Sequence, residues 1–340
     1  MKKKLYIMLL SALTLGGTFT SCSDNHMESV NTDDTKSPTI NPNAQLTTAL
    51  LQTYGDFGLM DTYRSYITGF TQYFAGGWNV SFYAGAVNPD NDQMRLIWDQ
   101  YYSVGIKNLV DAIHNSKDMP NTNAALRIHR VYLMSILTDT YGDIPCSEAG
   151  LGFIEGISNP KYDKQEDIYN WFFAELKDCV SQLGTGSDRI SGDVTSLNGD
   201  TDLWKKYANS LILRFAMRIS DVNPALAQQE FEGVLASESG YIGNSSENAY
   251  VKYLDAPFTL YDGSRDLDFR ANALSEILYG QDPTSPTFVC STLYNMLKDN
   301  NDPRLLKICR NYINTTRSET KPEGCFDVTD DMVAWENAGG

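Results

Sequence analysis

The residues that could perform acid–base or nucleophilic chemistry are few, and their spacing matches no catalytic motif. The chain of 340 residues has 3 histidines, His26, His114 and His129. None of them stands in the H-E-x-x-H pattern of zinc metalloproteases. There is also no G-x-S-x-G segment, which argues against an α/β-hydrolase. The Gly-rich stretch at Gly184 lacks the third glycine of a dinucleotide-binding turn, so we interpret it as a loop.

Carboxylates are abundant, with 43 Asp and Glu residues in the chain. Glu148 and Glu155 could flank a cleft as the two acids of a glycosidase, although many other acidic pairs could do the same. Residues 88–92 resemble the start of a calcium-binding EF-hand loop, but Gln93 replaces the glycine that this loop requires. We therefore predict no catalytic residues, no metal site and no cofactor, and a secreted glycoside hydrolase remains an alternative.

Residues 73–85 contain the most suggestive chemistry, because aromatic residues crowd a glycine-rich stretch that has no helical period. The aromatic residues are Tyr73, Phe74, Trp78, Phe82 and Tyr83, and Asn79 lies among them. An aromatic ring offers a flat apolar face that suits the C–H face of a sugar, while Asn and Asp can bind its hydroxyl groups. We predict that all of these residues except Phe74 bind a ligand. The alternative is that the rings pack this segment onto neighbouring helices.

The charge balance excludes several classes of partner. Lys and Arg number 27 against 43 acids, which gives a formal net charge of −16. A nucleic-acid-binding protein needs a basic surface, and a protein held electrostatically on an anionic bilayer needs one too. The 42% hydrophobic content is enough to form a substantial core.

The N-terminus has the features of an export signal. Lysines at positions 2–4 precede a short apolar stretch at 5–15, which is too short to span a bilayer. Small residues then lead to Cys22, in a pattern that resembles a bacterial lipoprotein signal. We predict a signal peptide at 1–21, lipidation of Cys22 and a polar, flexible tether at 22–42. The later cysteines show no C-x-x-C spacing, and we expect most of them to be buried thiols.

From about Asn43 the apolar residues recur with a helical period, which predicts an all-α domain over 43–340. Asp200 is placed to cap one helix, and Pro224 to open another. Several successive helix pairs suggest a tetratricopeptide-like scaffold with long ligand-binding loops. The expected helices are 44–66, 94–114, 123–140, 165–182, one after Asp200, one from Pro224, 269–279 and 286–299. The expected loops are 73–93, 141–164, 183–200 and 239–268.

Four stretches carry a family resemblance: Thr138–Ala149 (TDTYGDIPCSEA), Pro160–Tyr169 (PKYDKQEDIY), Trp204–Ser220 (WKKYANSLILRFAMRIS) and Asn301–Leu305 (NDPRL). In this order, and with the lipoprotein signal, the chain closely resembles the SusD/RagB family of outer-membrane lipoproteins of Bacteroidetes, specifically its SusD-like members.

The resemblance implies a non-enzymatic nutrient-binding protein that is lipid-anchored at the cell surface. Such proteins bind oligosaccharides, or peptides in some members, and deliver them to a SusC-type TonB-dependent transporter. The implied fold is an all-α scaffold of tetratricopeptide-like helix pairs. Family members continue beyond the Asn301–Leu305 region, so we expect this chain to be either C-terminally incomplete or a short variant. A second alternative is a lipoprotein adaptor that binds a protein partner through a tetratricopeptide-like groove.

Overall fold

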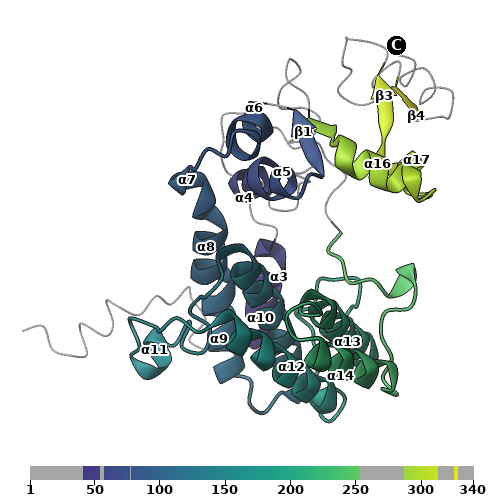
Figure 1. The fold of residues 1–340 in the computed structure, drawn as a ribbon. Coiled ribbons are helices and arrows are strands. Elements are labelled where there is room, and N and C mark those ends of the chain that lie inside the picture. Colours follow the sequence, from purple (N-terminus) through teal and green to yellow (C-terminus); the bar gives the residue numbers. More distant parts are fainter. Residues whose placement is uncertain (1–40, 54–56, 77, 253–286, 313–324, 328–340) are drawn as a thin grey trace, which may run out of the picture. The chain divides into compact units, whose positions relative to one another are not determined.

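The computed structural model describes residues 41–53, 57–76, 78–252, 287–312 and 325–327 (Figure 1). The predicted signal peptide, Cys22, the tether up to residue 40 and the expected helix at 269–279 lie outside these residues. No helix in the described ranges is long and apolar enough to cross a membrane.

The core of the structure is a series of helices that pack one against the next (Figure 1). Helix α10 (Pro120–Tyr141) contacts α12 (Gln165–Gln182), α12 contacts α13 (Thr201–Arg218), and α13 contacts α14 (Pro224–Leu235). This arrangement confirms the predicted all-α scaffold of helix pairs. Helix α10 also contacts α3 (Pro42–Gln52) and α9 (Lys107–His114), which contact each other as well.

Helix α13 shows how the sequence produces this scaffold. Asp200 caps the helix as predicted, because its carboxylate accepts hydrogen bonds from the backbone N–H groups of Asp202 and Leu203 at 2.8 and 3.1 Å. The apolar stripe of the helix is buried, with Trp204 and Phe215 each 1% exposed. The Phe215 ring lies 5.0 Å from that of Phe172 on α12, centroid to centroid, which joins the two helices through an aromatic contact.

The prediction of a loop over residues 73–93 is wrong for most of the segment. After strand β1 (Phe74–Gly76), the chain forms α6 (Trp78–Val80), a π-helical turn at Ser81–Gly85 and then α7 (Asn91–Met94). A π-helical turn contains an extra residue, which shifts the phase of the apolar stripe. This shift explains why no helical period is visible in the sequence.

Two further π-helical turns interrupt helical segments that the sequence did predict. The turn Tyr63–Ile67 lies between α4 (Phe57–Thr62) and α5 (Thr68–Phe70). The turn Tyr101–Ile106 lies between α8 (Leu96–Gln100) and α9. Residues 54–56 lie outside the described part, so the expected helix over 44–66 is described as α3 and the separate segment that begins at Phe57.

The long loop over 183–200 holds the N-terminal ends of two helices. The Asp188 carboxylate accepts hydrogen bonds from the backbone N–H groups of Asn121 and Thr122, at 3.1 and 2.8 Å, and so caps α10 from a distant part of the chain. Gly192 lies directly against α3, where an added Cβ would come within 1.9 Å of the Asn43 carbonyl oxygen. Any side chain at position 192 would therefore displace α3.

Short strands form two antiparallel pairs in the described part of the chain. Strand β1 pairs antiparallel with β2 (Thr287–Val289), and β3 (Arg310–Tyr312) pairs with β4 (Cys325–Asp327). The remaining described helices are the short α11 (Gly152–Glu155), α16 (Ser291–Asp299) and α17 (Leu305–Ile308), and Ser245–Glu247 forms a 3₁₀ turn. Cys146, Cys179 and Cys309 are buried free thiols, as expected.

Candidate functional site

The predicted ligand-binding residues divide into an exposed pair and an inward-facing pair. The rings of Tyr73 and Phe82 are 52% and 42% exposed. Tyr83 is only 8% exposed, and its ring lies 5.2 Å from that of Tyr66, centroid to centroid. The Trp78 side chain lies outside the described residues, so only its backbone position at the start of α6 is known.

The inward-facing residues Tyr83 and Asn79 are held by neighbouring acids. Asn79 donates from its amide nitrogen to both carboxylate oxygens of Asp61, at 3.1 and 2.9 Å, and Asp61 also pairs with the buried Arg64. Tyr83 donates its hydroxyl proton to Asp90 at 3.3 Å, and burial raises the pKa of that hydroxyl. These contacts fix the segment that carries the exposed rings.

Strand pairing places a third exposed ring beside Tyr73. Ala75 on β1 lies opposite Phe288 on β2, and the ladder continues with a hydrogen bond from the Cys290 N–H to the Tyr73 carbonyl oxygen at 2.8 Å. Tyr73 directly precedes β1 and Phe288 lies within β2, so both residues lie at this two-stranded ribbon. Phe288 is 57% exposed. Sequence reasoning missed Phe288, because only the strand pairing brings it to the site.

A charged pair accompanies these rings. Arg304 donates from Nε to both carboxylate oxygens of Asp302, at 2.9 and 3.0 Å, and this contact lowers the pKa of Asp302 to about 2. A long-range electrostatic interaction with Tyr73 is one of the causes that raise the pKa of the Arg304 guanidinium. Rings and hydrogen-bonding groups thus occur together, and we call Tyr73, Phe288, Asp302 and Arg304 the aromatic site. Among the described residues, no cluster of His, Cys, Asp or Glu is arranged to hold a metal ion.

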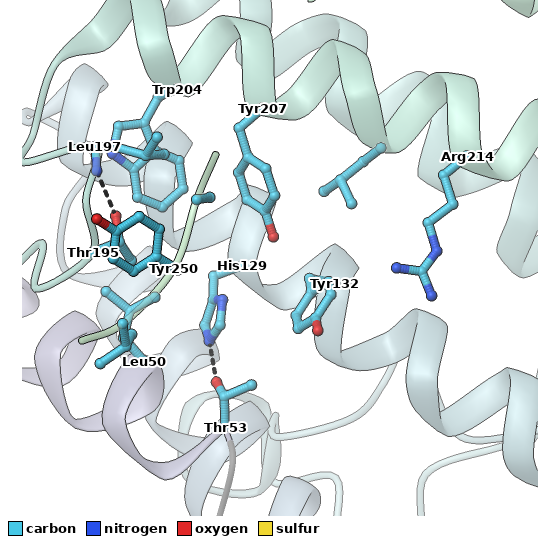
Figure 2. A pocket seen from close by; sticks show the side chains of 13 residues that line it. Leu50, Thr53, His129, Tyr132, Thr195, Leu197, Trp204, Tyr207, Arg214 and Tyr250 are labelled. Atoms are coloured by element: carbon cyan, nitrogen blue, oxygen red, sulfur yellow. Dashed lines mark hydrogen bonds between the residues drawn. The ribbon is translucent and has the colours of Figure 1, made fainter. Parts of the chain in front are cut away.

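A cavity of about 220 Å³ lies between helices α3, α10 and α13, apart from the predicted residues (Figure 2). Its walls also include two short segments around residues 195–197 and 249–251. The lining residues are Leu50, Thr53, His129, Tyr132, Thr195, Leu197, Trp204, Tyr207, Leu211, Arg214, Ala249, Tyr250 and Val251. The cavity is mainly aromatic and aliphatic, with Arg214 at one end (Figure 2).

Buried hydrogen bonds fix the walls of this cavity. The His129 ring Nε2 lies 2.8 Å from the Thr53 hydroxyl, which joins α10 to α3. Burial lowers the pKa of His129 to about 4, so this ring is uncharged at neutral pH. The indole N–H of Trp204 donates to Asp193 at 2.8 Å, which holds α13 to the loop over 183–200. The cavity is therefore preformed by its supporting helices.

Comparison with known proteins identifies the family. The SusD-like family model, described as starch-binding associating with outer membrane, matches residues 32–331. The chain belongs to this SusD-like family. The family resemblance that we drew from the motifs is thereby confirmed.

Solved structures of SusD-like proteins have the same fold. A SusD-like protein from Bacteroidetes is 39% identical, with a TM-score of 0.75 over 88% of this chain and 56% of its own. A chitin-binding protein is 35% identical, with a TM-score of 0.67 over 80% of this chain and 55% of its own. A SusD homologue from Bacteroides uniformis is 29% identical, with a TM-score of 0.60 over 78% of this chain and 54% of its own.

The chain thus spans little more than half the length of these SusD-like relatives. No match was found among curated proteins.

Proposed function

We propose that this SusD-like chain binds an oligosaccharide at the outer membrane and delivers it to a SusC-type TonB-dependent transporter, without catalysing a reaction. The description of the family model, starch-binding associating with outer membrane, supports glycan binding at that location. The relative named as a chitin-binding protein supports β-linked N-acetylglucosamine oligomers as the first ligands to test.

The observation that carries this proposal is the composition of the aromatic site. Two exposed rings, Tyr73 and Phe288, lie at the β1–β2 strand pair, and Arg304, which pairs with Asp302, interacts electrostatically with Tyr73. A pyranose ring is recognised by apolar stacking of its C–H face and by hydrogen bonds to its hydroxyl groups. Arg304 supplies donors and Asp302 supplies acceptors, so both kinds of sugar hydroxyl contact are available.

The other predicted residues take two roles in this proposal. Phe82 is exposed, and its ring lies 5.1 Å from that of Tyr83 in an edge-to-face contact, so it extends the aromatic surface. Tyr83 and Asn79 position that surface through Asp90 and Asp61. We keep Trp78 as a proposed ligand contact, on the basis of its place in the sequence between Tyr73 and Phe82.

The structural role of Glu148 argues against the glycosidase alternative. The Glu148 carboxylate accepts a hydrogen bond from the backbone N–H of Lys161 at 2.9 Å, so it braces the loop over 141–164. Glu155 lies on the short helix α11. In our proposal both acids are structural or solvent-facing, and no product is formed from the bound sugar.

Calorimetric titration of the full chain with chitohexaose and with maltohexaose tests the proposal. We expect saturable binding of at least one of these sugars, and chromatography of the sugar after the titration should show its original length. Shortened sugars would support the hydrolase. Absence of binding to both would contradict the glycan-binding proposal.

Attachment to the outer membrane is proposed to depend on Cys22, because the signal sequence places small residues directly before it. We expect the Cys22→Ala variant to be absent from the membrane fraction. In the protein without this substitution, Cys22 should carry the mass of an attached lipid. If the protein that retains Cys22 is found in the medium without a lipid, this part of the proposal is contradicted.

A further inference from the structure

The cavity between α3, α10 and α13 has a chemical character that the glycan proposal leaves unexplained. Its walls are formed mostly by rings and aliphatic side chains, which favour an apolar ligand body. The volume of about 220 Å³ is below the roughly 300–1,000 Å³ of sites for drug-sized ligands. A molecule about the size of an aromatic amino acid therefore suits the cavity better than an oligosaccharide.

At neutral pH, Arg214 is the one charged side chain among the residues that line the cavity. No Asp or Glu belongs to this lining, and His129 is uncharged there because burial lowers its pKa to about 4. Figure 2 shows the Arg214 side chain extending from α13 to the end of the cavity beside Tyr132. The cavity is thus locally positive, although the chain as a whole has a formal net charge of −16.

The neighbouring acids of the scaffold are engaged with other groups. Asp139 pairs with Arg218, one turn further along α13, at 3.1 Å. Asp193 accepts hydrogen bonds from the Trp204 indole and from backbone N–H groups. Within the described part of the chain, Arg214 has no ion pair with any carboxylate, unlike Arg218.

We propose that this cavity binds a small monocarboxylic acid with an aromatic or aliphatic body, whose carboxylate pairs with Arg214. The ligand body would pack between the rings of Tyr132 and Tyr207, which line the cavity from α10 and α13 (Figure 2). A guanidinium can bind both oxygens of a carboxylate at once, which gives both affinity and orientation. The cavity and the aromatic site share no residue, so acid binding and glycan binding are independent in this proposal.

A matched pair of ligands tests the proposal on the full chain. N-acetylphenylalanine carries one carboxylate on an aromatic body, and N-acetylphenylalanine amide has the same body without the charge. Ligand-observed NMR titrations at low ionic strength should give an affinity for the acid that is about tenfold or more above that for the amide, because a hydrogen-bonded ion pair replaces a neutral contact. Equal affinities, or no binding of the acid, would overturn the proposal.

Two variants locate the binding site. Arg214→Gln should lower the affinity for the acid to that for the amide, a loss of about tenfold. Arg189→Gln is the matched control, because Arg189 is exposed, does not line the cavity and carries the same charge. Unchanged binding of the acid to Arg214→Gln would overturn the assignment to this cavity. Circular dichroism shows whether each variant is folded, and the comparison of acid with amide on the unmodified chain stands without any variant.

Discussion

Replacement of Asp193 by alanine is expected to destabilise the scaffold strongly, although this residue lies in a loop. Its carboxylate accepts three hydrogen bonds, from the backbone N–H groups of Thr195 and Gly199 at 2.8 and 2.7 Å, and from the indole N–H of Trp204 at 2.8 Å. Trp204 is 1% exposed, so its N–H group cannot turn to solvent when the acceptor is removed.

The expected cost follows from these contacts. A buried donor left without a partner costs roughly 2 kcal/mol. The two backbone groups lie in a half-buried loop that water can partly solvate, and each contributes about 0.5–1 kcal/mol. The Asp193→Ala variant should therefore lose about 3 kcal/mol of unfolding free energy. Asp193→Asn keeps one acceptor oxygen and should lose about 1 kcal/mol.

Urea unfolding followed by circular dichroism measures this difference, provided that the slope of the transition is the same for each protein. Asp221→Ala is the control, because Asp221 is an exposed acid with no hydrogen bond or ion pair among the described residues. That substitution should change stability by less than about 0.5 kcal/mol. If Asp193→Ala is as stable as the control, the proposed role of the loop over 183–200 is wrong.

Two further predictions concern titratable side chains that are buried or half-buried. The folded protein holds His129 neutral, with a pKa lowered from 6.5 to about 4, while the unfolded chain binds a proton below pH 6.5. The unfolding free energy should therefore fall by up to about 3 kcal/mol as the pH decreases from 6.5 to 4. In thermal unfolding experiments over this pH range, His129→Gln should show a shallower decrease. An identical pH dependence in the variant would contradict this. The half-buried Glu175 lies 2.8 Å from Arg127 Nε. Arg127→Met should therefore lower the unfolding free energy by about 3 kcal/mol, because it leaves this carboxylate without its partner. Adding Glu175→Leu should recover most of that loss in urea unfolding, and additive losses would argue against the pairing.

The sequence predicts the regular helices of the scaffold well, because their stripes and caps are local signals. Helix α12 spans the predicted 165–182, and α13 begins directly after Asp200. The segment around Tyr83 was wrongly predicted as a loop, since its π-helical turn breaks the 3.6-residue period on which the prediction of a helix depends.

The candidate sites could be predicted only in part, for a different reason. Tyr73 and Phe82 stand out in the sequence, and the structure leaves both rings exposed. Phe288 joins Tyr73 only through the pairing of β1 with β2, which connects residues more than 200 positions apart in the sequence. Arg214 belongs to no motif that indicates a ligand, and only the packing of α10 and α13 places it at the end of a cavity.

The measurement that most directly tests the central proposal is the binding of chitohexaose to variants of the aromatic site. Tyr73→Ala and Phe288→Ala should each weaken binding by about tenfold, since each removes one stacking face. Phe153→Ala is the control, because this ring is 92% exposed on α11 and lies outside the aromatic site. Calorimetry should show control affinity equal to that of the unmodified chain. If all three variants bind chitohexaose like the unmodified chain, the sugar does not bind at the aromatic site.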